Sequence, residues 1–292
     1  MKRWMLMLSA AVLCGATSAQ AACRLEKIAE IPVTMENNLP MVDVEINGQK
    51  VRFLLDSGSR VSTISAETAQ RLGLPIDNID VIPNFAMSTG IPSHSQVSVA
   101  RTRQFLLNGK NIPYGKLFVT SDDRRHTERL GQDILAFADI EYDLPHGVVR
   151  LMRPRGCGDE NLAYWASGQQ VMTARAETIV PDWPHSMTMA TVNGTKLWAM
   201  FDTGSTASVI TEYAARRAGV TLTSPNVEPA GSVGWLNREP QKAWLAQFDK
   251  LAIGDLSLNG RSLTIRAHDI DLSYQKLFSV KNKSAARSRI YL

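Results

Sequence analysis

Residues 53–59 read FLLDSGS, and residues 199–205 read AMFDTGS. In each stretch an apolar run ends in an aspartate, a small hydroxyl residue, a glycine and a serine. One such motif is weak evidence, because these residues are common in turns. Asp56 and Asp202 are 146 residues apart (202 − 56 = 146), so the argument depends on whether their surroundings repeat at the same distance.

The surroundings of the two aspartates do repeat, and they repeat without a gap. Shifting the sequence by 146 residues aligns identical residues at Asn47-Gly48 and Asn193-Gly194, Ser62 and Ser208, Arg71 and Arg217, and Gly73 and Gly219. Similar apolar positions continue in this register as far as Val119 and Ile265. An ungapped register over about eighty residues indicates a tandem duplication of one unit.

Each unit is predicted to be mostly β-structure. Runs of alternating apolar residues flank Asn47-Gly48 and again Asn193-Gly194. An Asn-Gly pair between two such runs is the strongest short signal for a β-hairpin. The second pair also begins an Asn-x-Thr glycosylation sequon, but a tight turn explains it better.

A short helix is predicted after each aspartate motif. Residues 65–73 offer Ser65 as N-cap, Leu72 as an inward-facing residue and Gly73 as the end. Residues 211–219 repeat the pattern.

The motifs resemble the active-site strand of retropepsin-like aspartic proteases. The resemblance is carried by FLLDSGSRVSTIS (53–65) and AMFDTGSTASVIT (199–211), and by LGQDIL (130–135), which is similar to the apolar-apolar-Gly segment that passes behind the aspartate turn in that family. It implies a mainly β, pepsin-like protein in one chain. Two pseudo-twofold-related β-barrel lobes are expected, each with a short helix after its Asp motif.

By that resemblance Asp56 and Asp202 are a catalytic dyad. Two carboxylates a few ångströms apart do not both ionise cheaply, so they share one proton and hold a water between them. The ionised aspartate takes a proton from the water, and the protonated one polarises the scissile carbonyl. No cofactor or metal is needed for this chemistry.

Six neighbouring residues are predicted to support the dyad: Ser57, Gly58, Ser59, Thr203, Gly204 and Ser205. The glycines allow two backbones to approach closely. The hydroxyls of Ser57 and Thr203 are expected to bond across the pseudo-twofold axis to the opposing backbone. Those of Ser59 and Ser205 are expected to donate to the outer carboxylate oxygens. Flaps over a substrate are expected around Ser88, Thr89 and Gly90, and around Gly231 to Trp235, with Gly234 and Trp235 at the second tip.

Other chemistries lack a motif in this sequence. The five histidines are scattered, with no His-x-x-x-His or His-Glu-x-x-His spacing for a metal. There is no Gly-x-Ser-x-Gly and no phosphate-binding glycine motif. Basic pairs such as Arg124-Arg125 have no aromatic residues among them, which favours solvated faces over a nucleic-acid surface.

Residues 1–21 are predicted to be a signal peptide. Lys2 and Arg3 precede a short apolar stretch, and Ala19-Gln20-Ala21 fits a cleavage site. The apolar run is short for a membrane anchor, which needs about 20 residues, and no later stretch is apolar enough to span a bilayer. A lipid anchor on Cys23 is a weaker alternative, because the preceding residues lack leucine. The mature protein is expected in the periplasm or outside the cell.

Export would place Cys23 and Cys157 in an oxidising compartment, where an even pair is expected to form a disulfide. The two cysteines flank the first unit. The predicted first lobe covers residues 22–155, a linker covers 156–172, and the second lobe covers 173–292.

The repeat breaks near its end. Residues 137–152 best match residues 277–292, at a distance of 140 rather than 146 (277 − 137 = 140), so the second lobe is six residues shorter (146 − 140 = 6). The loss falls at the counterpart of residues 129–135. We expect residues 272–278 to form a shortened strand that still supports Asp202, and the alternative is a loosened second lobe.

The predicted function is that of a secreted aspartic endopeptidase acting on peptides or proteins, as a monomer with an internal pseudo-dimer and no stable membrane insertion. The alternative is a catalytically weak or inactive, protease-like module that binds peptides. A third possibility, that the two aspartates only cap turns, is disfavoured by their duplication.

Overall fold

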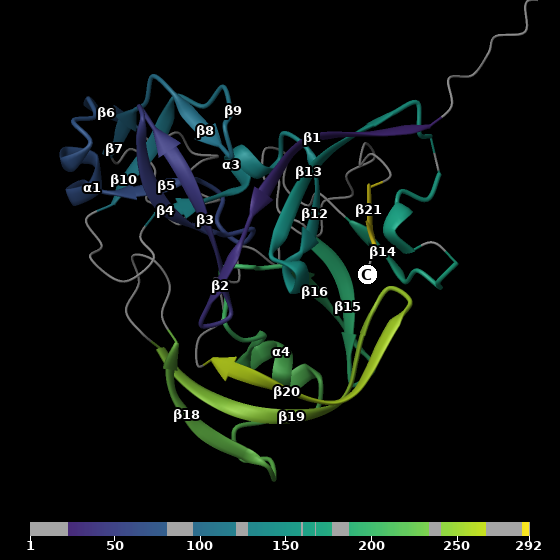
Figure 1. Cartoon of the computed structure of the whole chain (residues 1–292). Helices are drawn as coiled ribbons and strands as arrows, with labels where there is room; N and C mark the ends of the chain where they lie inside the picture. The colour runs from purple at the N-terminus through teal and green to yellow at the C-terminus, as the bar shows by residue number, and fades with distance from the viewer. Residues whose placement is uncertain are drawn as a thin grey trace, which may run out of the picture.

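The computed structural model describes residues 23–80, 96–120, 128–158, 160–166, 168–176, 187–233, 241–266 and 288–291 (Figure 1). Most of these residues lie in β-strands, and the helices are short. In Figure 1 the strands β3 to β10 gather at the upper left, while β18, β19 and β20 form the lower part around α4.

The first lobe contains the strands β1 (Arg24–Pro32), β2 (Thr34–Glu36), β3 (Leu39–Ile46), β4 (Gln49–Leu55), β5 (Thr63–Ser65), β6 (Ile76–Asp80), β7 (Gln96–Arg101), β8 (Phe105–Leu107), β9 (Lys110–Asn111), β10 (Lys116–Thr120), β11 (Arg129–Leu130), β12 (Asp139–Asp143) and β13 (Val148–Arg155). Its helices are α1 (Ala66–Arg71), α3 (Gln132–Leu135) and the 3-10 helix η1 (Leu144–His146). The main sheet has the order β6-β7-β10-β5-β11-β4-β3-β8-β9, with β2 paired to β3, and a second sheet has the order β1-β13-β12.

The second lobe contains the strands β14 (Thr173–Ala176), β15 (Met187–Val192), β16 (Thr195–Met200), β17 (Val209–Thr211), β18 (Val227–Val233), β19 (Gln241–Ile253), β20 (Leu256–Arg266) and β21 (Ser288–Tyr291), and the helix α4 (Glu212–Arg217). Its main sheet has the order β16-β15-β19-β20-β17, with β18 paired to β19. The 3-10 helix η2 (Tyr164–Ala166) lies between the lobes in the sequence.

The two Asn-Gly pairs form the predicted hairpin turns. β3 and β4 pair with Met41 opposite Leu54, and β15 and β16 pair with Met187 opposite Met200, each partner displaced by 146 residues. Type I′ turns need positive φ at both central residues, which Asn and Gly tolerate best. The φ angles are 49° at Asn47, 84° at Gly48, 46° at Asn193 and 81° at Gly194.

The helices after the aspartate motifs also repeat. The hydroxyl of Ser65 accepts from the backbone N–H of Thr68 and caps α1, and that of Thr211 accepts from Ala214 and caps α4. Gly73 follows α1 with a φ of 61°, a conformation that glycine adopts without strain. The predicted helices are therefore present in both units.

Each lobe has its own apolar core. In β3 the side chains of Val42, Val44 and Ile46 face inward, while the intervening Asp43 is exposed, as the period of two in a half-buried strand requires. The residues packed together in the second lobe include Val192, Ile210, Ala215, Ala218 and Phe248. The predicted fold class is confirmed: the protein is mainly β, with two lobes of repeated topology.

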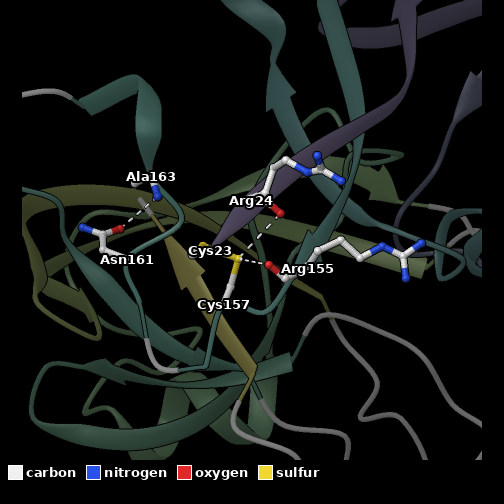
Figure 2. The surroundings of a disulfide bond; sticks show 6 residues. All are labelled: Cys23, Arg24, Arg155, Cys157, Asn161 and Ala163. Carbon is white, nitrogen blue, oxygen red and sulfur yellow. Dashed lines mark hydrogen bonds between the residues drawn. A yellow bond between two sulfur atoms is a disulfide. The ribbon is translucent and has the colours of Figure 1, made fainter. Parts of the chain in front are cut away.

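A disulfide joins Cys23 to Cys157, across 134 residues (Figure 2). It ties the residue before β1 to the segment after β13, and these two strands already pair along most of their length. The structure therefore contains the pair that the sequence predicted. Closing so long a loop restricts the unfolded chain, worth about 5 kcal/mol at most in a chain-entropy account.

Two sequence predictions fall on residues that the structure does not describe. The proposed flap residues Ser88, Thr89, Gly90, Gly234 and Trp235 lie outside the described ranges, as does the shortened support for Asp202 at 272–278. The closing match of the second lobe is partly visible, because β14 pairs antiparallel with β21 as β1 does with β13. Within the described ranges, no helix is long and apolar enough to cross a bilayer.

Candidate active site

Asp56 follows directly after the last residue of β4. β11 runs parallel to β4, with Leu130 opposite Leu55, and the N–H of Asp56 donates to the carbonyl of Leu130 at 3.0 Å. Leu54, Leu55 and Leu130 are buried. The apolar run before the aspartate therefore anchors the strand in the core, and Asp56 begins the turn from a fixed position.

The segment after β11 passes behind this turn, as the resemblance implied. The N–H of Gln132 donates to the carbonyl of Ser59 at 2.8 Å, and the side-chain amide of Gln132 donates to the carbonyl of Ser57 at 2.8 Å. A Cβ at Gly131 would lie 2.7 Å from the carbonyl oxygen of Val61. Only glycine fits there without a shift of the backbone.

The two aspartate turns bind each other reciprocally. The N–H of Ser57 donates to Thr203 Oγ1 at 3.0 Å, and the N–H of Thr203 donates to Ser57 Oγ at 3.0 Å. Each hydroxyl in turn donates to the opposite turn, Ser57 Oγ to the carbonyl of Phe201 and Thr203 Oγ1 to that of Leu55. These are the hydrogen bonds to the opposing backbone that were expected of Ser57 and Thr203, and their reciprocity relates the two turns by a pseudo-twofold axis.

The glycines of the two turns leave room for the opposing carboxylates. A Cβ on Gly58 would come within 2.6 Å of Asp202 Oδ2, and a Cβ on Gly204 within 2.6 Å of Asp56 Oδ2. In addition, the N–H of Gly58 donates to Asp56 Oδ1 at 3.0 Å, and that of Gly204 donates to Asp202 Oδ1 at 2.8 Å. Each carboxylate therefore lies against the glycine of the opposite turn, and Asp56 and Asp202 are close enough to interact.

The carboxyl groups differ in their electrostatic surroundings. Burial, followed by the negative charge of Asp56, raises the pKa of Asp202 to about 6, and the N–H of Gly204 and the charge of Arg129 oppose the shift. A proton is therefore retained on Asp202 through mildly acidic pH, as is expected for one of two close carboxyls.

The expected role of Ser59 and Ser205 is wrong. Ser59 Oγ donates to the carbonyl of Val61 at 2.9 Å, and Ser205 Oγ donates to that of Ala207 at 2.7 Å. A hydroxyl has one proton to donate, so neither serine donates to a carboxylate. Both instead close a local turn two residues further on, which is a common use of serine.

Arg129 takes the place that was expected for Ser59. Its Nη1 donates to Asp56 Oδ2 at 2.6 Å, and the arginine side chain is 20 % exposed against 3 % for the aspartate side chain. Charge-assisted hydrogen bonds of this length are among the stronger ones in proteins. β11 carries Arg129, and the parallel pairing with β4 sets it opposite Leu54.

The sequence contains a signal for Arg129. The family segment is apolar-apolar-Gly, and here the first apolar position before Gly131 is occupied by an arginine. Tyr142 was also missed. The residue as a whole exposes 36 % of its surface, and it interacts with Ser57 and with the charge of Asp56. Burial and the charge of Asp56 raise the pKa of Tyr142, and its interaction with Ser57 opposes the rise.

No group of three or more His, Cys, Asp or Glu side chains suited to a metal ion occurs among the described residues. The site residues present are two carboxyl groups, one guanidinium, hydroxyls and backbone N–H groups. This set can share a proton, hold a water and polarise a carbonyl, which are the elements of general acid–base hydrolysis.

Replacing Thr203 by Val should destabilise the contact between the turns. Valine keeps the shape but removes the hydroxyl, which leaves the buried N–H of Ser57 and the carbonyl of Leu55 without this partner. An unsatisfied buried polar group costs about 1–3 kcal/mol, so we expect the free energy of unfolding to fall by that amount in urea titrations. Thr203→Ser, which restores the hydroxyl, should remain close to wild type. Equal stability of the Val and Ser variants would contradict this role.

The sequence model of the aspartyl protease family matches residues 42–113 and 188–272, together more than half of the chain. The two matches begin 146 residues apart (188 − 42 = 146), which is the distance between the two aspartates. The chain therefore belongs to the aspartyl protease family, and it contains the family's unit twice. No curated protein matches the chain.

Three solved structures are similar to parts or most of the chain. A retropepsin-like aspartic protease from Rickettsia conorii is 15 % identical with a TM-score of 0.31, over 46 % of this chain and 94 % of its own. An aspartic proteinase from Irpex lacteus is 11 % identical with a TM-score of 0.41, over 79 % of this chain and 78 % of its own. The retroviral protease-like domain of Ddi1 from Leishmania major is 20 % identical with a TM-score of 0.27, over 41 % and 96 %. The family assignment rests on the repeated sequence match.

Proposed function

We propose that the protein is an aspartic endopeptidase whose catalytic dyad is Asp56 and Asp202. The observation that carries the proposal is the reciprocal bonding of the two turns, in which Ser57 and Thr203 each donate to and accept from the other turn. This bonding sets one carboxyl group from each lobe on either side of the axis. Turns that only needed capping would not require a partner 146 residues away.

The two aspartates have different roles in the proposed reaction. Asp202, with its pKa raised to about 6, holds the shared proton and donates a hydrogen bond to the scissile carbonyl. Asp56 accepts hydrogen bonds from Gly58 on Oδ1 and from Arg129 on Oδ2, and it takes a proton from the attacking water. The water adds to the carbonyl carbon, and protonation of the amide nitrogen releases the amine product.

The substrate class proposed is peptides or proteins, with one chain supplying the whole dyad. A peptide-binding module without catalysis is the second candidate. It is favoured by one observation: the ion pair between Arg129 and Asp56 occupies a carboxylate oxygen that a catalytic water would use. The ion pair leaves the other oxygens of the dyad to hold the water, so we favour the endopeptidase over the peptide-binding module.

We also propose that the mature protein acts outside the cytoplasm. The disulfide between Cys23 and Cys157 supports this location, because such bonds persist in oxidising compartments. The predicted signal peptide at residues 1–21 agrees with it. Alkylation before and after reduction, read by mass spectrometry on protein from the exported fraction, should show no free thiol in the mature chain.

The proposed activity is tested by incubating the purified mature protein with a mixed peptide library between pH 3 and pH 8 and sequencing new termini by mass spectrometry. We expect new termini in acid that are absent with Asp202→Asn and suppressed by a statine-type inhibitor. Thr195→Ser, a change on the hairpin strand of the second lobe, is the matched control and should cleave like wild type. Binding of peptides without any new terminus would favour the binding module instead.

A further inference from the structure

Arg129 brings a permanent positive charge to the proposed dyad. Among the residues that the structure describes, one of its donors has a hydrogen bond at the site, the Nη1 that contacts Asp56 Oδ2. The Nε atom is buried and has no hydrogen-bond partner among the described residues. A guanidinium carries five N–H donors in a planar fork, and a fifth of this side chain is exposed. The contact with Asp56 therefore uses a small part of what Arg129 can donate.

The charge of Arg129 changes the electrostatics that a substrate meets. Two aspartates that share one proton carry a net charge of −1, which repels an acidic side chain and attracts a basic one. Arg129 adds +1, so the dyad and the arginine together are neutral. An acidic substrate group near the scissile bond is then not repelled by the site as a whole, because the charge of Arg129 compensates that of the dyad.

The position of Arg129 limits which part of a substrate it can reach. Its Nη1 lies 2.6 Å from an oxygen of the proposed dyad, so a substrate group that reaches the exposed part of this side chain is close to the bond being cleaved. A planar guanidinium matches the two oxygens of a carboxylate, a fit that a neutral amide or an ammonium group does not give. The exposed part of the side chain is the part available for this contact.

We propose that Arg129 is a specificity-determining residue that selects substrates with an aspartate or glutamate side chain beside the scissile bond. This proposal rests on the proposed function, since it assigns the substrate class of the same site. It differs from a purely positioning role, in which Arg129 would only hold Asp56 and would be indifferent to the charge of the substrate.

Binding of uncleavable peptides tests the proposal without requiring turnover. The probes are statine-type peptides that are identical except for Glu, Gln or Lys at the residue on either side of the statine, measured by fluorescence polarisation at pH 5.5. Of the two Glu peptides, with Glu before or after the statine, we expect one to bind wild type about tenfold more tightly than the matching Gln peptide. One charge-assisted hydrogen bond provides a difference of this size. The Lys peptide should bind more weakly than either.

Variants separate recognition from folding. Arg129→Gln should remove the preference for Glu over Gln, and Arg129→Lys, which keeps the charge without the fork, should retain only part of it. Arg101→Gln is the matched control, because Arg101 pairs with Asp77 at the surface of β6 and β7 and should leave the preference unchanged. If Arg129→Gln does not fold, the binding of the Glu and Gln peptides to wild type and to Arg129→Lys still tests the proposal.

Two results would overturn the proposal: equal binding of the Glu and Gln peptides by wild type, or a preference that survives in Arg129→Gln. The proposed function fails by a different result, namely the absence of cleavage when the same sequences are offered as ordinary peptides. A preference for Glu in binding without any cleavage would keep the role of Arg129 and reject the catalytic one.

Discussion

Replacing Asp56 by Asn or Asp202 by Asn is expected to reduce kcat/KM for a peptide substrate by about 10³-fold or more, and replacing both is expected to reduce it no further. The two carboxyls share one proton and one water, so removing either leaves a site that lacks either its base or its acid. Losses within such a unit do not add.

The measurement is kcat/KM for the three variants on one fluorogenic peptide at pH 5, with circular dichroism and urea unfolding to show that each variant is folded. Asn has nearly the same shape as Asp, and the reciprocal bonds between the turns use Ser57 and Thr203 rather than the carboxyls. A folded single variant with near-normal activity, or a double variant whose loss is the product of the two single losses, would count against a shared dyad.

The same two substitutions are expected to change stability in different directions. The pKa of Asp202 is raised from its usual 3.8 to about 6 in the folded protein. A group of this kind stabilises the fold below its unfolded pKa, and that contribution is lost as pH rises through the folded pKa. Above pH 6 the ionised Asp202 therefore costs the fold about 3 kcal/mol at most, and Asp202→Asn should be more stable than wild type at pH 7.5 by up to that amount.

Asp56→Asn should instead be less stable than wild type at pH 4.5. It removes the charge that pairs with Arg129 while Asp202 is protonated, so the guanidinium remains largely buried without a counter-charge. Breaking a fully buried ion pair costs about 3–5 kcal/mol, and the exposed part of Arg129 reduces this to about 2 kcal/mol. Urea titrations of both variants and wild type at pH 4.5 and 7.5 provide the comparison. Similar shifts for the two variants at both pH values would contradict the asymmetric dyad.

Local and repeated features of the fold could be predicted from the sequence. The hairpins at Asn47-Gly48 and Asn193-Gly194 and the Ser65 cap of α1 are set by residues within a few positions of one another. The repeat then doubled each of these signals. The reciprocal bonds between the two turns were also predictable, because a duplicated motif on a pseudo-twofold axis meets its own copy.

The remaining features depend on contacts that local patterns do not specify. Arg129 reaches Asp56 across 73 residues of sequence, through the parallel pairing of β11 with β4. The prediction for Ser59 and Ser205 was wrong because of local contacts. Each hydroxyl closes a turn by donating to a carbonyl two residues further on and does not reach the carboxylate.

The central claim is that Asp56 and Asp202 work as one dyad that shares a proton, and the dependence of kcat/KM on pH tests it most directly. We expect activity between pH 3 and 8 to fall on the alkaline side near pH 6, as Asp202 loses its proton. Arg129→Gln should move this limb to higher pH, because the charge of Arg129 lowers the pKa of Asp202. The double variant Ser59→Ala/Ser205→Ala is the control and should leave it in place, since those hydroxyls donate to carbonyls. A rate that keeps rising through pH 8, unaffected by Arg129→Gln, would contradict the shared proton and with it the dyad.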